Sequence, residues 1–348
     1  MTHRGRLLVS GPRRMGKSTI LRVAADRVRQ DGGVVLVADL ATAASLTEVA
    51  DRLLAAVATA EPWTRRLSDW ARALAPVVSL SFDPAGHPRL AVGLDMRSRR
   101  EEDERMLLER VLDRIDDVAQ TERAPVVLVL DEFQRLAELG GEASEWLLRN
   151  RIQENVHTAV VCAGSKEALI NEMLQPKRAF YRFFERLEVG PIEEDHLARW
   201  IDERLAGSGL DGGEGVGREL VERVGPRTQD IVQAARVLWF RAAPTGRVGP
   251  DAAAEAVAEV VDQEDAALRR TWEDLTPLQQ RLLRAVAAGE DALHASHVRA
   301  QYDLGPSSSV TTALDALTRR SILTRTGSSV QFDSPFFREW AVRELVRR

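Results

Sequence analysis

A glycine-rich loop near the start of the chain constrains its fold more than any other feature. Residues 11–18 read Gly-Pro-Arg-Arg-Met-Gly-Lys-Ser, between the apolar run 7–9 and a segment with helical apolar spacing. They match the pattern G-x-x-x-x-G-K-[ST] in the strand–loop–helix setting that it requires. Gly11 and Gly16 let the backbone turn its N–H groups toward phosphate oxygens, and the following helix adds its positive N-terminal end. The loop therefore predicts an α/β fold that binds phosphate groups, and its context disfavours a chance glycine-rich turn.

Two side chains of this loop have predicted chemical roles. Lys17 is expected to reach the β- and γ-phosphates of a nucleotide, and Ser18 is expected to hold Mg²⁺. The chain has three lysines against 45 arginines, so composition alone does not explain a lysine at this position. The other residues predicted to bind the nucleotide are Gly11, Pro12, Arg13, Arg14, Met15, Gly16 and Thr19.

Length and composition limit the class of protein. At 348 residues the chain exceeds one typical domain, and its 44% apolar and 29% charged residues are ordinary for a globular protein. A net charge of −5 excludes a surface that is basic throughout, so any contact with nucleic acid has to be local. No apolar stretch reaches the roughly 20 residues of a membrane span, and the polar start does not resemble a signal peptide. We therefore expect a cytoplasmic protein without membrane contact.

Apolar runs separated by helical segments predict a parallel sheet covered on both faces. After the run at 7–9, the runs lie at 34–39, 126–130, 158–163 and, more weakly, 187–189. The single cysteine, Cys162, lies inside one of them and is expected to be a small buried residue. In such a sheet the ligand lies beyond the carboxyl ends of the strands. The residues at those ends are Asp39, Asp131, Glu132 and Ser165.

Two adjacent acids, Asp131 and Glu132, follow the third run in the arrangement called Walker B. Asp131 is expected to coordinate Mg²⁺ directly or to lie in its outer shell, and Glu132 to polarise an attacking water. Adjacent acids at a buried strand end are costly unless a cation or hydrogen bonds compensate. The alternative is a solvated pair that opens a loop.

Ser165 ends the fourth run, and two roles are open for it. Its hydroxyl could contact the γ-phosphate or position the water, as a sensor residue does. It could also cap a helix over residues 166–174. Both roles could hold together.

About 86 residues separate the second and third runs. Helical patterns lie at 45–60 and 62–75, and a hairpin is predicted from the apolar segments 77–82 and 90–94 around the turn at 83–88. A charged helix is expected over 101–120, and this insertion could be a partner surface or scaffold. Its inward residues are expected to be Met106, Leu107, Val111, Leu112 and Ile115.

Taken together, these segments resemble the archaeal-type ATPase family, P-loop proteins of the AAA+/STAND group with a C-terminal winged helix. The resemblance covers nearly the whole chain and implies binding and hydrolysis of ATP with Mg²⁺. Its most specific carrier after the P-loop is the tetrad Asp-Glu-Phe-Gln at 131–134. The other carriers are the segments 163–165, 181–182 and 187–192.

The resemblance also implies an arginine near the start of the last strand, which Arg182 matches. In related AAA+ proteins an arginine there reaches the γ-phosphate, often that of a neighbouring subunit, which makes a homo-oligomer one candidate state. Arg178 and Arg186 are expected one helical turn away on either side, so the choice among the three stays open. A solvated basic helix face is the alternative.

Two further points concern how the nucleotide would be held. Arg227, in Gly225-Pro226-Arg227-Thr228, resembles a second sensor arginine, and the alternative is a proline in the first turn of a helix. Members of the family usually carry 20 or more residues before the P-loop strand, including a box that helps to hold adenine. Here residues 1–6 precede it, so phosphate binding is predicted and adenine selectivity is left open.

The rest of the chain predicts a helical lid and a winged helix-turn-helix. Lid helices are expected at 193–205, 217–224, 228–240 and 250–270, and their orientation could report which nucleotide is bound. Helices at 277–288, 295–302 and 307–320, then a hairpin at 322–332, form the winged-helix pattern, with Ser307 or Ser308 capping the third helix. The exposed positions of that helix are expected to be Ser308, Ser309, Thr312, Asp315, Arg319 and Arg320.

The charge of this last module suits modest phosphate contact. From Thr276 onward it has 10 arginines and 7 acidic residues, a net of +3. Because winged helices also serve as protein-contact modules, DNA and a partner protein both remain open as its target.

The sequence thus predicts an α/β fold: a P-loop NTPase parallel sheet with a helical lid and a C-terminal winged helix-turn-helix. The expected domains are 1–192 for the core, with an insertion at about 41–122, then 193–272 for the lid and 273–348 for the winged helix. The leading hypothesis is a Mg²⁺-dependent ATPase whose nucleotide state controls contacts with DNA or a partner protein. The alternatives are an ATP-gated switch with little hydrolysis and a DNA-binding regulator that acts through the winged helix.

Overall fold

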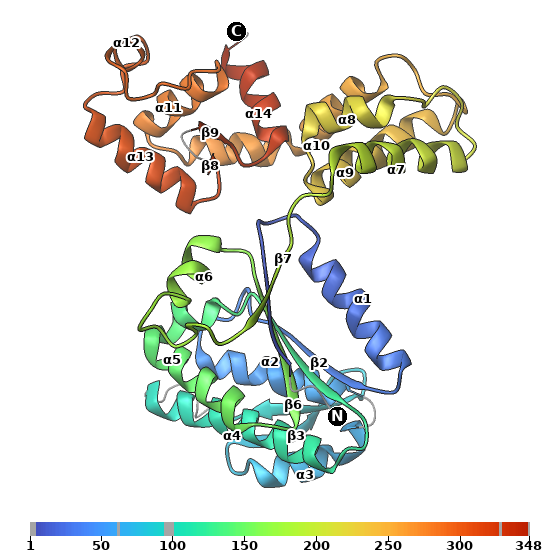
Figure 1. The fold of residues 1–348 in the computed structure, drawn as a ribbon, viewed down its shortest axis with the longest axis vertical. Helices are drawn as coiled ribbons and strands as arrows, with labels where there is room; N and C mark the ends of the chain where they lie inside the picture. The colour runs from blue at the N-terminus through green and yellow to red at the C-terminus, as the bar shows by residue number, and fades with distance from the viewer. Residues whose placement is uncertain (1–4, 61–62, 94–100, 327–328, 347–348) are drawn as a thin grey trace. The chain divides into compact units, whose positions relative to one another are not determined.

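The computed structural model describes residues 5–60, 63–93, 101–326 and 329–346. The chain divides into two compact units, Met1–Gly190 and Pro191–Arg348. Figure 1 colours the first unit from blue to green and the second from yellow-green to red.

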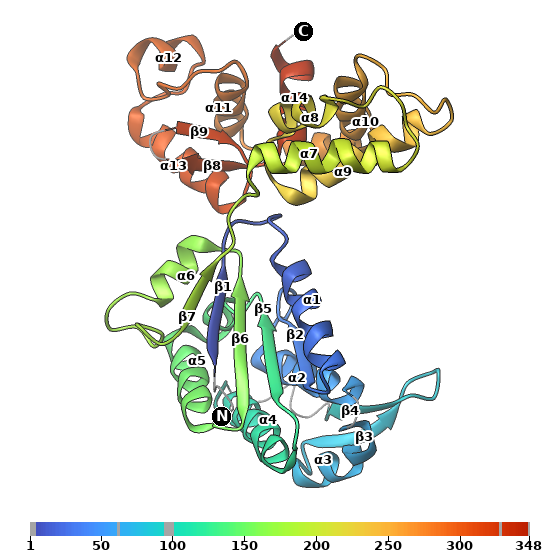
Figure 2. The same ribbon diagram turned by 45° about the vertical axis from the view of Figure 1, so that its right-hand side comes forward.

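A five-stranded parallel sheet forms the centre of the first unit, in the order β2-β5-β6-β1-β7 (Figure 2). This confirms the α/β fold that the apolar runs predict. Because β1 lies between β6 and β7, the loop that follows it emerges inside the sheet and not at an edge. The strands are β1 (Arg6–Ser10), β2 (Val34–Asp39), β5 (Val126–Asp131), β6 (Thr158–Gly164) and β7 (Glu185–Glu188).

The register of the sheet aligns the carboxyl ends of its strands. Ser10, the last residue of β1, is paired with Gly164 of β6 and with Glu188 of β7. Asp39 of β2 is paired with Asp131 of β5. The loops after these strands therefore leave the sheet at one edge, where a parallel sheet places its ligand.

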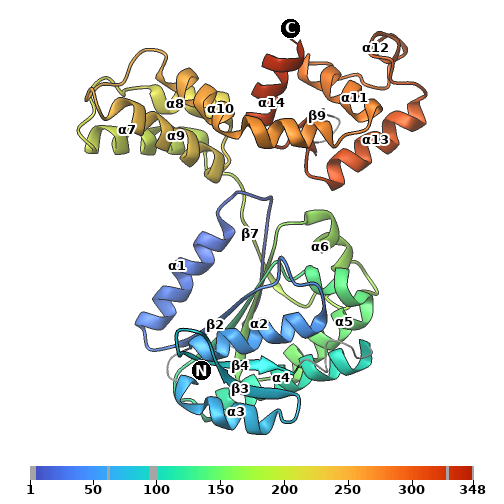
Figure 3. The same ribbon diagram turned by 180° about the vertical axis from the view of Figure 1, so that it is seen from behind.

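Helices cover the two faces of the sheet unequally (Figures 1 and 3). On one face, α1 packs alone in a small apolar cluster with Val35 and Val129. On the other face, three helices pack with Leu36 and Leu128 into the main core of the unit. Cys162 is fully buried there, and burial raises the pKa of its thiol. The helices are α1 (Lys17–Gln30), α2 (Leu46–Thr59), α4 (Glu101–Thr121) and α5 (Arg135–Glu154).

The segment between β2 and β5 adds a helix pair and a hairpin to this core. Trp63 and Trp70 are fully buried, with ring centroids 5.8 Å apart. Met106 is 56% exposed, so its predicted inward position is wrong, because Leu107 and Val111 define a face one residue away. Leu94 of the expected hairpin lies outside the described residues. Besides α2 and α4, the elements are η1 (Trp63–Arg66), α3 (Leu67–Ala73), β3 (Val78–Phe82) and β4 (Pro88–Val92).

The second unit begins with four helices that share one apolar core with the module after them. Trp340 donates its indole N–H to Asp265, 2.8 Å away, which links α10 to α14. The predicted boundary at 272–273 therefore falls within a continuous core, and it stays a prediction. The four helices are α7 (Glu194–Gly207), α8 (Val216–Val224), α9 (Thr228–Ala242) and α10 (Ala252–Glu273).

Three helices and a hairpin then form the winged-helix arrangement, as predicted. Thr276 and Gln279 make a capping box at the start of α11. The predicted caps Ser307 and Ser308 are wrong, since the cap residue of α13 is Pro306 and both serines lie inside the helix. The wing residues Gly327 and Ser328 lie outside the described part of the chain. The elements are α11 (Pro277–Ala287), α12 (Ser296–Gln301), α13 (Ser307–Arg319), β8 (Leu323–Thr326), β9 (Ser329–Phe332), α14 (Pro335–Ala341) and the π-helical turn Val342–Val346.

Candidate active site

The glycine-rich loop after β1 has glycines at two points where its backbone is strained for a residue with a side chain. Gly11 has a φ of 145°, and a Cβ placed on it would stand 2.1 Å from the carbonyl oxygen of Val189. Gly16 has a φ of 89° and is the N-cap of α1. Arg14 also has a positive φ, 68°, and its side chain is exposed. The loop is therefore tightly curled between the end of β7 and the start of α1.

Lys17 turns back into this curl. Its ammonium donates hydrogen bonds to the carbonyl oxygens of Gly11, at 2.7 Å, and Pro12, at 2.6 Å. Only 6% of the residue is exposed. The loop thus holds a buried positive charge at the place where the sequence predicts phosphates.

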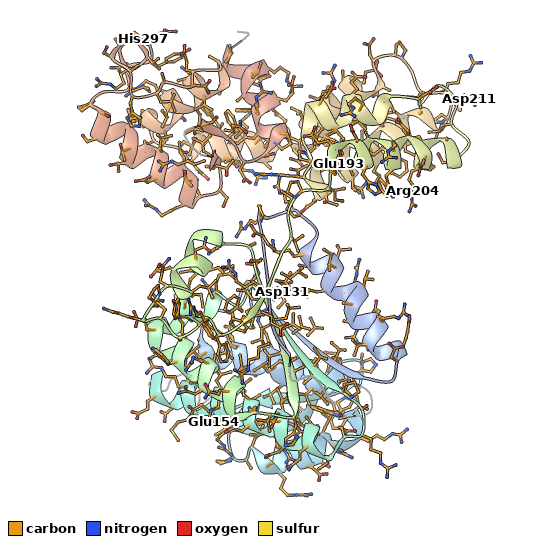
Figure 4. The ribbon with its side chains drawn as sticks, viewed as in Figure 1. Asp131, Glu154, Glu193, Arg204, Asp211 and His297 are labelled. Carbon is orange, nitrogen blue, oxygen red and sulfur yellow. The ribbon has the colours of Figure 1, made fainter. Side chains whose placement is uncertain are left out.

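The loop is linked directly to the strand end of β5. Ser18 donates its hydroxyl hydrogen to Asp131 Oδ2 at 2.7 Å, and the backbone N–H of Glu132 donates to Asp131 Oδ1 at 3.0 Å. Figure 4 shows Asp131 where β5 ends. A hydroxyl and one carboxylate suit Mg²⁺, which keeps several waters and takes one or two protein ligands besides phosphates. The predicted metal residues are therefore brought together, and the oxygen donors present fit that ion.

Glu132 lies beside this pair in a polar cluster of its own. Its φ is 54°, a left-handed conformation that is unusual for a residue with a Cβ. Its carboxylate accepts hydrogen bonds from Ser165 Oγ, at 2.7 and 3.0 Å, and from the amide of Gln134. Arg13 Nε in turn lies 3.4 Å from Ser165 Oγ. The cluster therefore joins the P-loop, the end of β5 and the end of β6.

Of the two roles open for Ser165, the helix cap is wrong. The helix α6 (Glu167–Met173) has Lys166 as its N-cap, without a side-chain capping bond. Ser165 is 9% exposed and uses its hydroxyl on Glu132 instead. Gln134 is a site residue that sequence reasoning missed, since the tetrad at 131–134 contains it but nothing there indicates what its amide contacts.

Arginines 178, 182 and 186 differ in their surroundings. Residues 174–184 form turns, so the predicted spacing of one helical turn is wrong. Arg178 binds the fully buried carboxylate of Glu145, and also Glu172 at 2.7 Å, and these acids raise its pKa above the ordinary value. Arg182 is exposed, with a φ of 52° and its guanidinium 5.3 Å from the ring centre of Tyr181. Arg186 is exposed on β7.

Arg227 lies in the second unit as the N-cap of α9. Its guanidinium donates to the backbone carbonyl of Asp333 and, at 3.0 Å, to the carboxylate of the same residue. The alternative of a proline in the first helical turn is wrong, because Pro226 precedes the cap. A sensor role for Arg227 stays a prediction.

Family models match both ends of the chain. Residues 1–161 match the AAA ATPase domain, and residues 266–343 match the probable winged helix domain. The chain combines an AAA ATPase domain with a winged helix domain. This confirms the resemblance drawn from the P-loop, the Asp-Glu-Phe-Gln tetrad and the last module. No curated protein matches the sequence.

Three solved structures with a similar fold are a Walker-type ATPase and two ORC proteins. A Walker-type ATPase of Pyrococcus abyssi has a TM-score of 0.63 and 17% identity, with 98% of this chain and 91% of that one covered. The ORC2 protein of Aeropyrum pernix, solved in ADPNP and ADP complexes, has a TM-score of 0.59 and 14% identity over 99% and 89%. The ORC1 protein of the same organism, solved with DNA, has a TM-score of 0.53 and 17% identity over 98% and 87%. At these identities the likeness concerns the fold.

A membrane-spanning helix needs about 20 consecutive apolar residues. In the ranges that the structure describes, no helix combines the length and the apolar character needed to cross a bilayer.

Proposed function

We propose that the AAA ATPase domain hydrolyses ATP with Mg²⁺, and that the bound nucleotide controls the contacts of the lid and winged helix with DNA or a partner protein. The observation that carries the proposal is the 2.7 Å hydrogen bond from Ser18 to Asp131, with Glu132 next to it. This contact joins the loop that would bind phosphates to the acids that would act on water. A solvated acid pair at the start of a loop would need no such link.

The residues of the loop would bind the triphosphate. Lys17 would exchange the carbonyls of Gly11 and Pro12 for phosphate oxygens, which are stronger acceptors for an ammonium because they are charged. Ser18 and Asp131 would hold Mg²⁺, which neutralises charge on the phosphates when bound. The N-terminus of α1 adds its partial positive charge at the same point.

Glu132 would act on the attacking water. Its carboxylate would accept a proton as the water oxygen bonds to the γ-phosphorus and the bond to the bridging oxygen breaks, which gives ADP and inorganic phosphate. Ser165 donates to this carboxylate and so restricts its orientation. We propose Lys17, Glu132, Ser165 and an arginine, Arg182, as the catalytic set.

Phosphate release by the whole chain tests the proposal. We expect Mg²⁺-dependent turnover, and loss of it in Lys17→Ala. Lys177→Gln is a matched control, because Lys177 is an exposed lysine of the same unit. Equal turnover by Lys17→Ala and the parent protein would overturn the proposal.

A second candidate, an ATP-gated switch with little hydrolysis, is favoured by the surroundings of Arg182. Its guanidinium lies over Tyr181 at the surface of the first unit, whereas Arg178 is held by carboxylates. An exposed arginine of this kind could serve the nucleotide of a second copy of the chain, and a lone chain would then turn over slowly. Turnover per chain that rises steeply with protein concentration would support assembly-dependent catalysis, and a flat, very low rate would support the switch.

Contact with DNA is proposed for the winged helix domain. The ORC1 protein with a similar fold was solved with DNA, and α13 presents an exposed face with Thr312 and Arg319. We expect the whole chain to bind duplex DNA with an affinity that falls as salt rises, because phosphate contacts release counterions. Binding that is absent at low salt would favour a protein partner.

A further inference from the structure

Gln134 makes a contact that none of the roles above uses. It is only 2% exposed, and its side-chain amide donates to Glu132 Oε2. An ionised carboxylate only accepts hydrogen bonds, so the NH₂ of the amide is the end that has to face it. Glu132 is therefore held by two donors, the amide of Gln134 and the hydroxyl of Ser165.

The carbonyl oxygen of the Gln134 amide shows that the amide fits a space left for it by the surrounding residues. Gln134 Oε1 is buried, and it has no hydrogen-bond partner among the described residues. A Cβ added to Gly164 would lie 2.3 Å from this oxygen and 2.6 Å from Ile170 Cδ1. The absent side chain at the end of β6 thus makes room for the amide. A buried acceptor without a partner is unfavourable, so the amide is not placed there to satisfy its own oxygen.

The backbone of Glu132 adds a reason for a second donor. Its φ of 54° is strained for a residue with a Cβ, and such strain persists only where neighbouring contacts hold it. Catalytic groups that are misplaced by a small distance lose much of their effect on rate. The side chains of Gln134 and Ser165 each donate a hydrogen bond to Glu132, and together they limit how far its carboxylate can turn.

We infer that Gln134 is a positioning residue for the hydrolytic reaction, and that its amide N–H holds the Glu132 carboxylate in its working orientation. Gly164 supports this role by leaving space for the amide. The inference rests on the proposed function and goes beyond it by assigning a residue that contacts neither the predicted phosphates nor the predicted metal ligands.

Three variants of the whole chain test this inference by steady-state kinetics. Gln134→Met removes the donor and keeps the approximate volume, and we expect kcat to fall about tenfold with KM changed less than about twofold. Gln134→Glu keeps the shape and replaces the donor by a second carboxylate, so its kcat should fall further. Thr47→Val is the control, because Thr47 is 1% exposed in the same unit and its hydroxyl has no partner among the described residues.

The order of kcat for the parent chain, Gln134→Met and Gln134→Glu distinguishes a positioning role of Gln134 from a packing role. If Gln134 only filled space, Glu would be the mildest change because it has the same shape, and that order would overturn the inference. Thermal melting shows which variants fold, and should Gln134→Met not fold, the comparison of Gln134→Glu with the parent decides.

A double-mutant cycle supplies a readout that packing alone would not move. In a Glu132→Gln background, Gln134→Met should change kcat by less than about twofold, because the carboxylate that it positions is gone. Gly164→Ala should lower kcat in the parent background, and combining it with Gln134→Met should add little. Fully additive losses in either pair would overturn the inference.

ATP hydrolysis by the chain and the positioning role of Gln134 are overturned by different results. A parent chain that releases no phosphate with Mg²⁺ and ATP overturns the proposed function and this inference with it. A parent chain that turns over ATP, beside a folded Gln134→Met with unchanged kcat, overturns only the role of Gln134.

Discussion

The candidate active site of the AAA ATPase domain and the exposed face of α13 in the winged helix domain place their charged groups in different surroundings. In the first, Lys17 is almost fully buried, and Glu132 is held by the buried donors Ser165 and Gln134. In the second, Arg325 pairs with Asp315 at 2.8 Å, and their side chains are 41% and 43% exposed. Charges removed from water act strongly and in fixed directions, whereas exposed pairs are screened and easily exchanged.

This difference in the burial of charged groups suits catalysis in one place and binding in the other. A buried, linked cluster suits a reaction, because its groups are already oriented when charge develops. Exposed pairs suit a surface that exchanges one partner for another, such as a carboxylate for a phosphate. We therefore expect substitutions in the first domain to change rates and stability by large factors, and substitutions in the second to change binding by small ones.

The largest expected effect is on catalysis. Glu132→Gln should lower ATP turnover by about 10²- to 10⁴-fold, because the side chain can no longer accept a proton from water. Binding of ATP should persist. Phosphate release and nucleotide titration measure the two, with Glu154→Gln as a control at an exposed carboxylate. If Glu132→Gln turned over ATP as fast as the parent protein, the buried cluster around Glu132 would not be the part of the molecule that carries the reaction.

The next effect is on stability, and it compares one arginine in each unit. Arg178→Ala leaves the fully buried Glu145 without its cation, and it should lower the free energy of unfolding by about 3 kcal/mol. Arg241→Ala breaks exposed pairs with Glu255 and Glu259 and should leave stability unchanged within error. Denaturant unfolding measures both, and equal losses would show that burial is not what distinguishes these pairs.

A smaller effect is expected from the capping box of α11. Thr276→Ala removes the hydroxyl that accepts from Gln279 N and should cost about 1 kcal/mol. Ser308→Ala should have no resolved effect, because Ser308 lies inside α13 and does not cap it. A larger loss from Ser308→Ala than from Thr276→Ala would restore the cap that the sequence predicts.

The smallest effect is on duplex binding. Asp315→Asn should release Arg325 for phosphate contact, raise affinity about two- to threefold and steepen the salt dependence by about one unit. Arg319→Ala should act in the opposite direction. Fluorescence anisotropy over a range of salt concentrations gives both quantities, and unchanged slopes for both variants would remove the winged helix from any DNA contact.

Local patterns were enough to predict most of the fold. Apolar runs of β-branched residues mark the strands 34–39, 126–131 and 158–164, because a strand covered on both sides needs apolar side chains throughout. The P-loop and the Asp131-Glu132 pair are likewise recognisable from short patterns, and the structure places them side by side.

Contacts between distant segments could not be predicted from such patterns. The bond from Ser165 to Glu132 depends on how β5 and β6 are aligned, and the space beside Gln134 depends on Gly164. The engagement of Arg178 depends on Glu145, 33 residues away in α5. Where the error was local, as at Met106, a helical face was displaced by one residue, which periodicity resolves poorly.

Calorimetric titration of the whole chain with ATP tests the central claim most directly. With Mg²⁺ present, the account predicts saturable binding that Lys17→Ala abolishes and that Lys177→Gln leaves unchanged. Folded parent protein that shows no heat of binding, or Lys17→Ala protein that binds as the parent does, would contradict it.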